Sequence, residues 1–217
     1  MTTPPTPLPP LPDPALIVVD MQNDFVHPGA PMEVAGARDI LPGLGRLIAA
    51  FRAARRPVVF LRYMGNRRYD HLAEKFGWIT TMAPPVRACE PGHLRRFADG
   101  VEREGFAIVE NLTPAAGEIV IDKTYYSGFH ETDLHTRLQK AGVQSLCITG
   151  LITEMCVEDT ARHAVHHGYP TAILKDLVAS SDPQAATATL AAFDKNFGWV
   201  ARADDMKNKL QTPVAGE

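Results

Sequence analysis

The sequence predicts an α/β domain built on a mostly parallel sheet with helices on both faces. Three observations predict it: short apolar runs recur along the chain, segments with helical spacing separate them, and the two kinds of segment alternate. The chain has 217 residues and 45% hydrophobic content, which suits one domain with a sizeable core.

Strands are expected where apolar residues follow one another without interruption. These runs are residues 16–20, 57–61, 119–122, 146–150, 171–176 and a short one at 198–201. Helices are expected where apolar residues recur at helical spacing, at 40–55, 133–140, 156–167 and 183–197. Residues 62–96 are rich in Gly, Pro, Arg and aromatic residues and are too long for a plain connection. Such excursions often build a pocket.

The ends of the chain differ in composition from its middle. Residues 1–14 (MTTPPTPLPPLPDP) are proline-rich, and we expect a flexible tail there. Residues 15–210 are expected to form the single domain, with a second flexible tail at 211–217.

Charge and cysteine content exclude several classes of partner. A net charge of −3 and a pI near 6.2 provide no broad positive field, so no nucleic acid and no anionic membrane is expected as a partner. No apolar run approaches the roughly 18 residues that span a bilayer, and no signal-like segment opens the chain. Three cysteines without zinc-type spacing favour a reducing compartment, so we expect a cytoplasmic protein.

Cys156 is the first candidate for chemistry. It follows the predicted strand that ends at Gly150 and stands at or just inside the start of the next helix. Unpaired N–H groups and the helix dipole at such a position stabilise a thiolate, which is the nucleophilic form. The alternative on position alone is a small buried cysteine, which is by far the commoner role of this residue type.

Two charged residues end predicted strands, where the chemistry of parallel sheets gathers. Asp20 follows four apolar residues, and partial burial there raises a carboxyl pKa towards the range of a general base. Lys123 ends its own strand and is placed to pair with Asp20. A turn-capping Asp and a surface Lys remain the alternatives on these residues alone.

Other motifs are incomplete. Gly43-Leu-Gly45 lacks the third glycine of a dinucleotide loop and does not follow a strand. No GxSxG motif of a serine hydrolase occurs. His163, His166 and His167 share a predicted helix but lack a nearby acidic ligand pattern, so we expect them to face solvent.

Three segments together resemble one family, the isochorismatase-like cysteine hydrolases. They are residues 16–25 (LIVVDMQNDF), 123–134 (KTYYSGFHETDL) and 150–162 (GLITEMCVEDTAR), and the resemblance runs from about residue 15 to 205. It implies a three-layer Rossmann-like fold, a catalytic triad of Asp20, Lys123 and Cys156, and a homo-oligomer, either dimer or tetramer. It also implies a cis peptide between Leu151 and Ile152, with backbone N–H groups of Ile152 and Cys156 forming the oxyanion hole.

The branch of the family follows from three further features. The presence of Cys156 favours C–N bond hydrolysis over vinyl ether cleavage. The stretch after the second strand holds His71 but no Asp-x-His pair, so we expect no metal and no cofactor. Residues 123–129 and 197–200 (FGWV) resemble the ureidoacrylate, biuret and N-carbamoyl amidohydrolase branch.

The activity that this implies is hydrolysis of a small amide or ureido substrate through a thioester-type acyl-enzyme, with release of ammonia or an amine. A nicotinamidase-like hydrolase of an aromatic amide, and a non-catalytic member of the fold that binds a small ligand, are the alternatives.

Candidate substrate-binding residues surround the predicted strand ends. Phe25, Tyr126 and Phe129 flank the two catalytic strand tips, where they can stack on a flat ureido group or equally pack in the core. Tyr63 and Asn66 follow the second strand and are expected to meet the far end of the substrate. Gln184 begins the last long helix, where its amide can read a substrate carbonyl or remain exposed.

Overall fold

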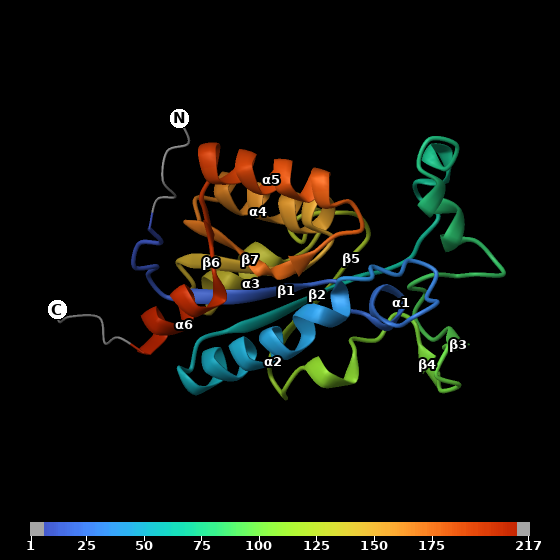
Figure 1. Ribbon diagram of the computed structural model, residues 1–217, viewed down its shortest axis with the longest axis horizontal. Helices are drawn as coiled ribbons and strands as arrows, with labels where there is room; N and C mark the ends of the chain where they lie inside the picture. The colour runs from blue at the N-terminus through green and yellow to red at the C-terminus, as the bar shows by residue number, and fades with distance from the viewer. Residues whose placement is uncertain (1–6, 212–217) are drawn as a thin grey trace.

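Six strands form one parallel sheet in the computed structural model, which describes residues 7–211 (Figure 1). Their order across the sheet is β5-β2-β1-β6-β7-β8, and each neighbouring pair is parallel. The strands are β1 (Pro14–Val19), β2 (Val58–Tyr63), β5 (Ile119–Lys123), β6 (Ser145–Leu151), β7 (Thr171–Ala179) and β8 (Trp199–Ala201). The α/β class expected from the sequence is confirmed.

The strand order places a crevice between β1 and β6. From β1 the chain moves to one side of the sheet through β2 and β5, and it then crosses back to build β6, β7 and β8 on the other side. At the carboxyl ends of β1 and β6, Val19 lies opposite Gly150. At the carboxyl ends of β2 and β5, Tyr63 lies opposite Lys123. The loops that follow such strands leave in opposite directions, which opens a binding crevice between them.

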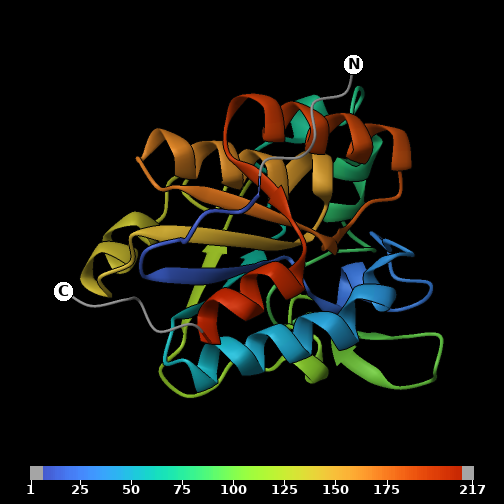
Figure 2. The ribbon, with the colours of Figure 1, turned by 60° about the vertical axis from the view of Figure 1, so that its left-hand side comes forward.

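Helices cover both faces of the sheet (Figures 1 and 2). They are α1 (Asn23–Val26), α2 (Ala37–Ala53), α3 (Leu134–Lys140), α4 (Glu158–His166), α5 (Pro183–Asn196) and α6 (Ala203–Gln211). Side chains of β1 alternate between the layers: Leu16 and Val18 pack in the core with α2 and α6, and Ile17 and Val19 in the core with α3, α4 and α5. Burial on both faces explains why β1 is apolar throughout.

A long excursion between β2 and β5 stands at the carboxyl ends of the strands. It contains the 3-10 turns η1 (Asp70–Leu72), η2 (Gly77–Met82) and η3 (Glu110–Leu112), and the antiparallel pair β3 (Leu94–Arg96) and β4 (Glu102–Glu104). Asp24 of α1 anchors this excursion from inside. Its carboxylate accepts hydrogen bonds from Arg95 Nε (2.7 Å) and from the backbone N–H of Cys89 (2.7 Å), and it is fully buried.

Both ends of the described chain differ from expectation. Part of the predicted N-terminal tail packs on the domain, because Leu8 and Leu11 bury their side chains in the core that contains α2. Pro14 already belongs to β1. The helix α6 was not predicted, and its Met206 is buried against the same core. Nearly all of the predicted C-terminal tail lies outside the described residues. Within residues 7–211, no helix is long and apolar enough to cross a membrane.

The Asp24–Arg95 pair is expected to hold the excursion on the domain. Arg95→Met leaves a buried carboxylate without its cation, which typically costs about 3–5 kcal/mol. Arg103→Ala is the control, because its partner Asp99 is exposed and such pairs contribute about 1 kcal/mol or less. Urea unfolding of both variants and the parent measures the difference. Equal midpoints for the two variants would contradict the anchoring role.

Candidate active site

Asp20 and Lys123 form a buried ion pair at the carboxyl edge of the sheet. Asp20 directly follows β1, and Lys123 ends β5, two strands away. The Lys123 side chain reaches past β2 and over the ring of Tyr63, with Nζ 5.3 Å from its centroid. Nζ then donates to Asp20 Oδ2 (2.8 Å) and to the backbone carbonyl of Tyr125 (3.0 Å). Both charged residues have an exposed fraction of 0%.

Cys156 lies in a π-helical turn, Thr153–Val157, that follows β6. The backbone N–H of Val157 donates to the carbonyl of Ile152 (3.1 Å), the wide spacing that defines such a turn. The expectation of a helix N-terminus was therefore wrong in detail, since α4 begins two residues later, at Glu158. The peptide between Leu151 and Ile152 is cis, as the resemblance implied.

A glycine permits the approach to this turn. Gly150 has φ of +100°, and a Cβ at this position would lie 2.1 Å from the backbone carbonyl oxygen of Val19. Only glycine fits between β1 and β6 here. The carboxyl ends of the two strands consequently lie close together, and the loops that carry Asp20 and Cys156 begin side by side.

Burial and charge shape the titration of the three groups. Burial raises the pKa of the Asp20 carboxyl, and Lys123 offsets part of that rise. Burial lowers the pKa of Lys123, but the negative charges available on Asp20 and Cys156 outweigh it and keep the amine protonated. Burial raises the pKa of the Cys156 thiol, and Lys123 opposes this. One buried cation thus lies beside two groups that can carry a negative charge, Asp20 and Cys156.

One carboxylate oxygen of Asp20 is available for proton transfer. Oδ2 accepts from Lys123, whereas Oδ1 is buried and has no partner that meets hydrogen-bond geometry among residues 7–211. Burial raises the pKa of this carboxyl, and a hydrogen bond with the Cys156 thiol opposes part of that rise. The thiol is therefore the candidate donor of a proton to this carboxylate.

The loop after Asp20 is held by buried amides that sequence reasoning did not assign. Gln22 Nε2 donates to the carbonyls of Tyr63 (3.0 Å) and Phe106 (2.9 Å), and Gln22 Oε1 accepts from the N–H of Tyr63 (2.7 Å). Asn23 Nδ2 donates to the carbonyl of Glu104 (2.9 Å). The polar run directly after an apolar strand was the available signal, because buried amides need such partners.

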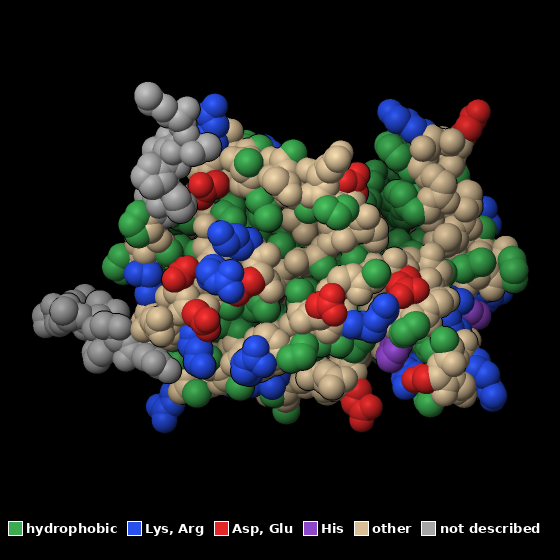
Figure 3. Space-filling model, viewed as in Figure 1, with side chains coloured by type: hydrophobic (Ala, Val, Ile, Leu, Met, Phe, Trp, Pro, Cys, Tyr) green, Lys and Arg blue, Asp and Glu red, His purple; other side chains and the backbone are tan. Residues whose placement is uncertain are grey.

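A cavity of about 220 Å³ opens beside the thiol, and Cys156 is part of its wall. Of the six predicted substrate-binding residues, Phe25, Tyr63 and Tyr126 line it. Ile152, expected to provide a backbone donor, also lines it. Figure 3 shows a notch with hydrophobic side chains between the segment that carries η1 and η2 and the end of α5.

The other three predicted contact residues lie elsewhere. Asn66 fixes its own loop by donating to the carbonyls of Met64 (3.1 Å) and Thr124 (2.9 Å). Phe129 is buried among the rings of His163, His167 and Tyr169. Gln184 is exposed in the first turn of α5. Because none of the three borders the cavity, the contact set reduces to Phe25, Tyr63 and Tyr126.

Other parts of the wall come from segments that the sequence did not single out. Trp78 belongs to η2, Met32 and Glu33 follow α1, Ser181 precedes α5, and Met155 stands next to Cys156 in the π-helical turn. Apart from Met155, neither periodicity nor motif marks these positions, since they meet only once the excursion folds back over the sheet.

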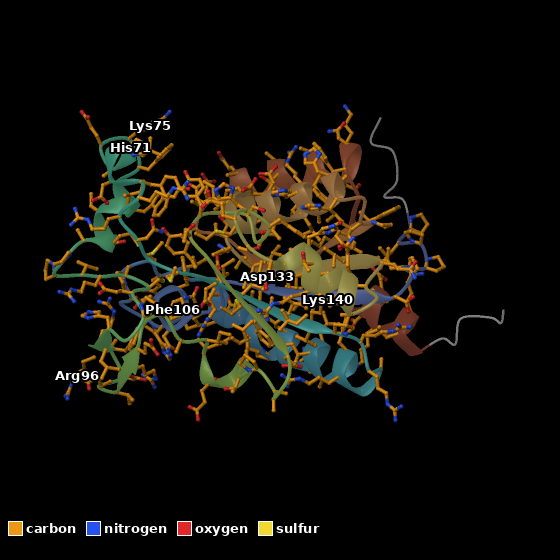
Figure 4. All side chains as sticks on the ribbon, turned by 180° about the vertical axis from the view of Figure 1, so that it is seen from behind. His71, Lys75, Arg96, Phe106, Asp133 and Lys140 are labelled. Carbon is orange, nitrogen blue, oxygen red and sulfur yellow. The ribbon has the colours of Figure 1, made fainter. Side chains whose placement is uncertain are left out.

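The described residues contain no cluster of three or more His, Cys, Asp or Glu side chains arranged to hold a metal ion. His71 stands at the outer tip of the excursion (Figure 4). The rings of His163 and His167 stack nearly parallel, 5.1 Å apart, and His167 stacks on His135. His163 also bonds Ser127 Oγ through Nδ1 (2.9 Å). The expectation of solvent-facing histidines therefore holds for His166 and His167, which are exposed, but not for His163, which is half-buried.

Comparisons with known proteins identify relatives of the chain in sequence and in fold. Residues 14–205 match the Isochorismatase domain family. The ureidoacrylate amidohydrolase RutB of Methylobacterium radiotolerans is 33% identical over 213 residues, covering 93% of this chain and 82% of that protein. A cysteine hydrolase from Pseudomonas syringae pv. phaseolicola superposes with a TM-score of 0.80 at 26% identity, covering 97% and 99% of the two chains. N-carbamoylsarcosine amidase from Thermoplasma acidophilum superposes with a TM-score of 0.69 at 25% identity, covering 94% and 99%.

Iodoacetamide at neutral pH is expected to label Cys156 before Cys89 and Cys147, because Cys156 lines the cavity and the others are fully buried. Asp20→Asn should slow labelling of Cys156 at least about tenfold, as loss of a general base does. Asp99→Asn, on the exposed pair with Arg103, is the control. Mass spectrometry of tryptic peptides over time gives the rates, and unchanged labelling in Asp20→Asn would contradict the proton transfer.

Proposed function

The chain belongs to the isochorismatase family, and from that premise we propose that it is a cysteine-dependent amidohydrolase. Its substrate is a small amide or ureido compound, and the bond cleaved is a C–N bond. The observation that carries the proposal is the position of Cys156 in the cavity wall beside a fully buried Asp20–Lys123 pair. The names of its relatives, which include amidohydrolases and an amidase, support this reaction class.

The first half of the reaction makes the acyl-enzyme. Asp20 Oδ1 takes the proton of the Cys156 thiol, and Lys123 stays protonated beside both groups. The negative charge passes from oxygen to sulfur, so the buried site keeps the same total charge. The thiolate attacks the amide or ureido carbonyl, and an S–C bond forms. Asp20 returns the proton to the leaving nitrogen, the C–N bond breaks, and ammonia or an amine departs.

The oxyanion of the tetrahedral intermediate is proposed to lie against backbone N–H groups of Ile152 and Cys156. Both residues line the cavity; Ile152 directly precedes the π-helical turn and Cys156 lies within it. Donors of this kind typically lower the barrier by about 3–4 kcal/mol each.

The second half of the reaction hydrolyses the acyl-enzyme and regenerates the free enzyme. Water loses a proton to Asp20 and attacks the acyl carbon, and the S–C bond breaks. With a ureido substrate the product is a carbamate, which decomposes to an amine and carbon dioxide. The thiolate of Cys156 then recovers its proton from Asp20, which restores the starting charges.

We also propose that catalysis needs no metal, that the protein is cytoplasmic and that it is a homo-oligomer. The first point rests on a mechanism in which a thiolate and backbone N–H donors require no Lewis acid. The free state of Cys89, Cys147 and Cys156 supports a reducing compartment. The oligomer rests on the family resemblance.

Ammonia release tests the function across a panel of alkyl ureas, N-carbamoyl amines and aromatic amides. We expect turnover of at least one class by the parent protein and a loss of at least about a thousandfold in Cys156→Ala, which lacks the nucleophile. Far-ultraviolet circular dichroism checks that the variant folds. Turnover by Cys156→Ala within tenfold of the parent would reject the cysteine mechanism, and a panel without turnover would favour a non-catalytic, ligand-binding protein.

Asp20→Asn and Lys123→Met should each lower kcat/KM at least about a hundredfold, as expected for a general base and its charged partner. The pH dependence of kcat/KM should reflect the raised pKa of Asp20. The base must be deprotonated, so activity is high above the raised pKa of Asp20 and is lost as pH falls through it. An acid limb at the pKa of an ordinary aspartic acid would contradict a buried base.

Extensive EDTA treatment followed by metal analysis is expected to leave the rate unchanged, because a thiolate with backbone oxyanion donors requires no Lewis acid. A stoichiometric metal whose removal abolishes turnover, and whose return restores it, would overturn this expectation.

A further inference from the structure

The cavity beside Cys156 has almost no positive charge. Its walls are chiefly aromatic and aliphatic, and Glu33 is the one charged side chain among its described lining residues. Glu33 is ionised at neutral pH, because hydrogen bonds from the backbone N–H of Gly29 and from Arg38 lower its pKa. Arg38 binds Glu33 and the carbonyl of Val26 but does not line the cavity.

A second cavity next to the first one is negative. It has a volume of about 630 Å³ and shares Trp78, Tyr126 and Met155 with the first. Three carboxylates, those of Glu154, Glu158 and Asp159, line it together with one guanidinium, that of Arg162.

The one guanidinium in this second cavity, that of Arg162, already has an anionic partner. Arg162 binds Glu158 through Nε (2.9 Å) and Nη2 (2.5 Å), and its guanidinium lies over the ring of Phe197. Glu154 accepts from Ser180 Oγ at Oε1 (2.7 Å), and its Oε2 is buried without a hydrogen-bond partner in the described chain. A carboxylate that enters here meets uncompensated negative charge.

The two remaining sources of positive potential near Cys156 are also occupied. Lys123 is fully buried and bound to Asp20 and Tyr125. The N-terminus of α5 begins just after Ser181, which lines the first cavity, and the Asp182 carboxylate already accepts its first free N–H groups, from Gln184 and Ala185 (both 3.0 Å). Among the residues that line the two cavities, no arginine or lysine is therefore free to bind a substrate carboxylate.

The curated relatives that this sequence matches are named for a negatively charged substrate. Their name specifies ureidoacrylate, and acrylate is a carboxylate at neutral pH. Binding such a group requires a cation or a set of free N–H donors. We infer that this enzyme selects uncharged ureido or amide substrates with an apolar substituent and rejects their carboxylate-bearing analogues, with Glu154 and Glu33 as the discriminating residues. The inference rests on the proposed amidohydrolase function and narrows its substrate class.

The physical basis is a difference between two substrates of similar shape. An apolar substituent gains contact with Phe25, Trp78 and Met155. A carboxylate of the same size loses its hydration and meets the carboxylate of Glu33 in the first cavity or that of Glu154 in the second. Like charges at an interface are strongly unfavourable. Specificity here comes from repulsion as much as from attraction.

The test compares 3-methylbutylurea with 3-ureidopropionate, which differ mainly in a branched alkyl end against a carboxylate. We expect kcat/KM for ammonia release to be at least about a hundredfold higher for the uncharged compound, since close like charges cost several kcal/mol. In Glu154→Gln and Glu33→Gln the ratio of kcat/KM for 3-methylbutylurea to kcat/KM for 3-ureidopropionate should be smaller than in the parent. The main cause should be a lower KM for 3-ureidopropionate. Glu118→Gln is the control for net charge, because Glu118 pairs with Arg52 away from both cavities, and its ratio should match that of the parent.

Binding of both compounds to Cys156→Ala by calorimetry provides a readout independent of turnover. Equal or tighter binding of the anion, or ratios in the two carboxylate variants equal to those of the parent, would overturn the inference while leaving the amidohydrolase intact. Failure of the uncharged compound to bind would also overturn it. Absence of ammonia release across the whole panel of ureas, carbamoyl amines and aromatic amides would instead remove the proposed function.

Discussion

The buried ion pair between Asp20 and Lys123 is the interaction on which the site depends. Removing two charges from water is costly, and the cost is recovered only if each charge keeps its partner in good geometry. The structure meets this condition with a 2.8 Å contact and a second bond from Lys123 to a backbone carbonyl. With one cation in the site, Asp20 and Cys156 share one negative charge. A proton shift between them consequently changes no net charge and requires little reorganisation.

The strand order makes this pair possible. Lys123 comes from the edge strand β5, and its side chain has to pass the end of β2 to reach Asp20 beyond β1. The close approach of β1 and β6 at Gly150 brings the cysteine turn to the same point. Buried amides and the Asp24 carboxylate then tie the loop after β1 to the excursion that closes the cavity. The same buried polar contacts thereby serve both the catalytic loop and the cavity wall.

Several features of the site could be predicted from the sequence because their signals are local. Phe25, Tyr63 and Tyr126 follow strand ends closely, so their position in the cavity wall depends on few residues. Phe129 lies only three residues beyond Tyr126, yet it turns into the core against the histidine rings. Asn66 and Gln184 are equally close to strand or helix ends. The Asn66 side chain binds backbone carbonyls, however, and the Gln184 side chain is exposed to solvent. Proximity to a strand end in the sequence thus predicted that a residue lies near the site, but it did not predict where its side chain points.

The sequence by itself determined the class of fold, the positions of the six strands and the three residues proposed for the chemistry. Apolar runs on strands buried from both sides and polar residues at strand tips are visible without a structure, because each depends on neighbours in the chain. Tertiary structure alone decided that Cys156 lies in a π-helical turn and that Trp78, Glu33 and Glu154 border the cavities. These groups come from segments far apart in sequence. Which of them lie near one another is decided only when the strand order and the folded excursion bring these segments together.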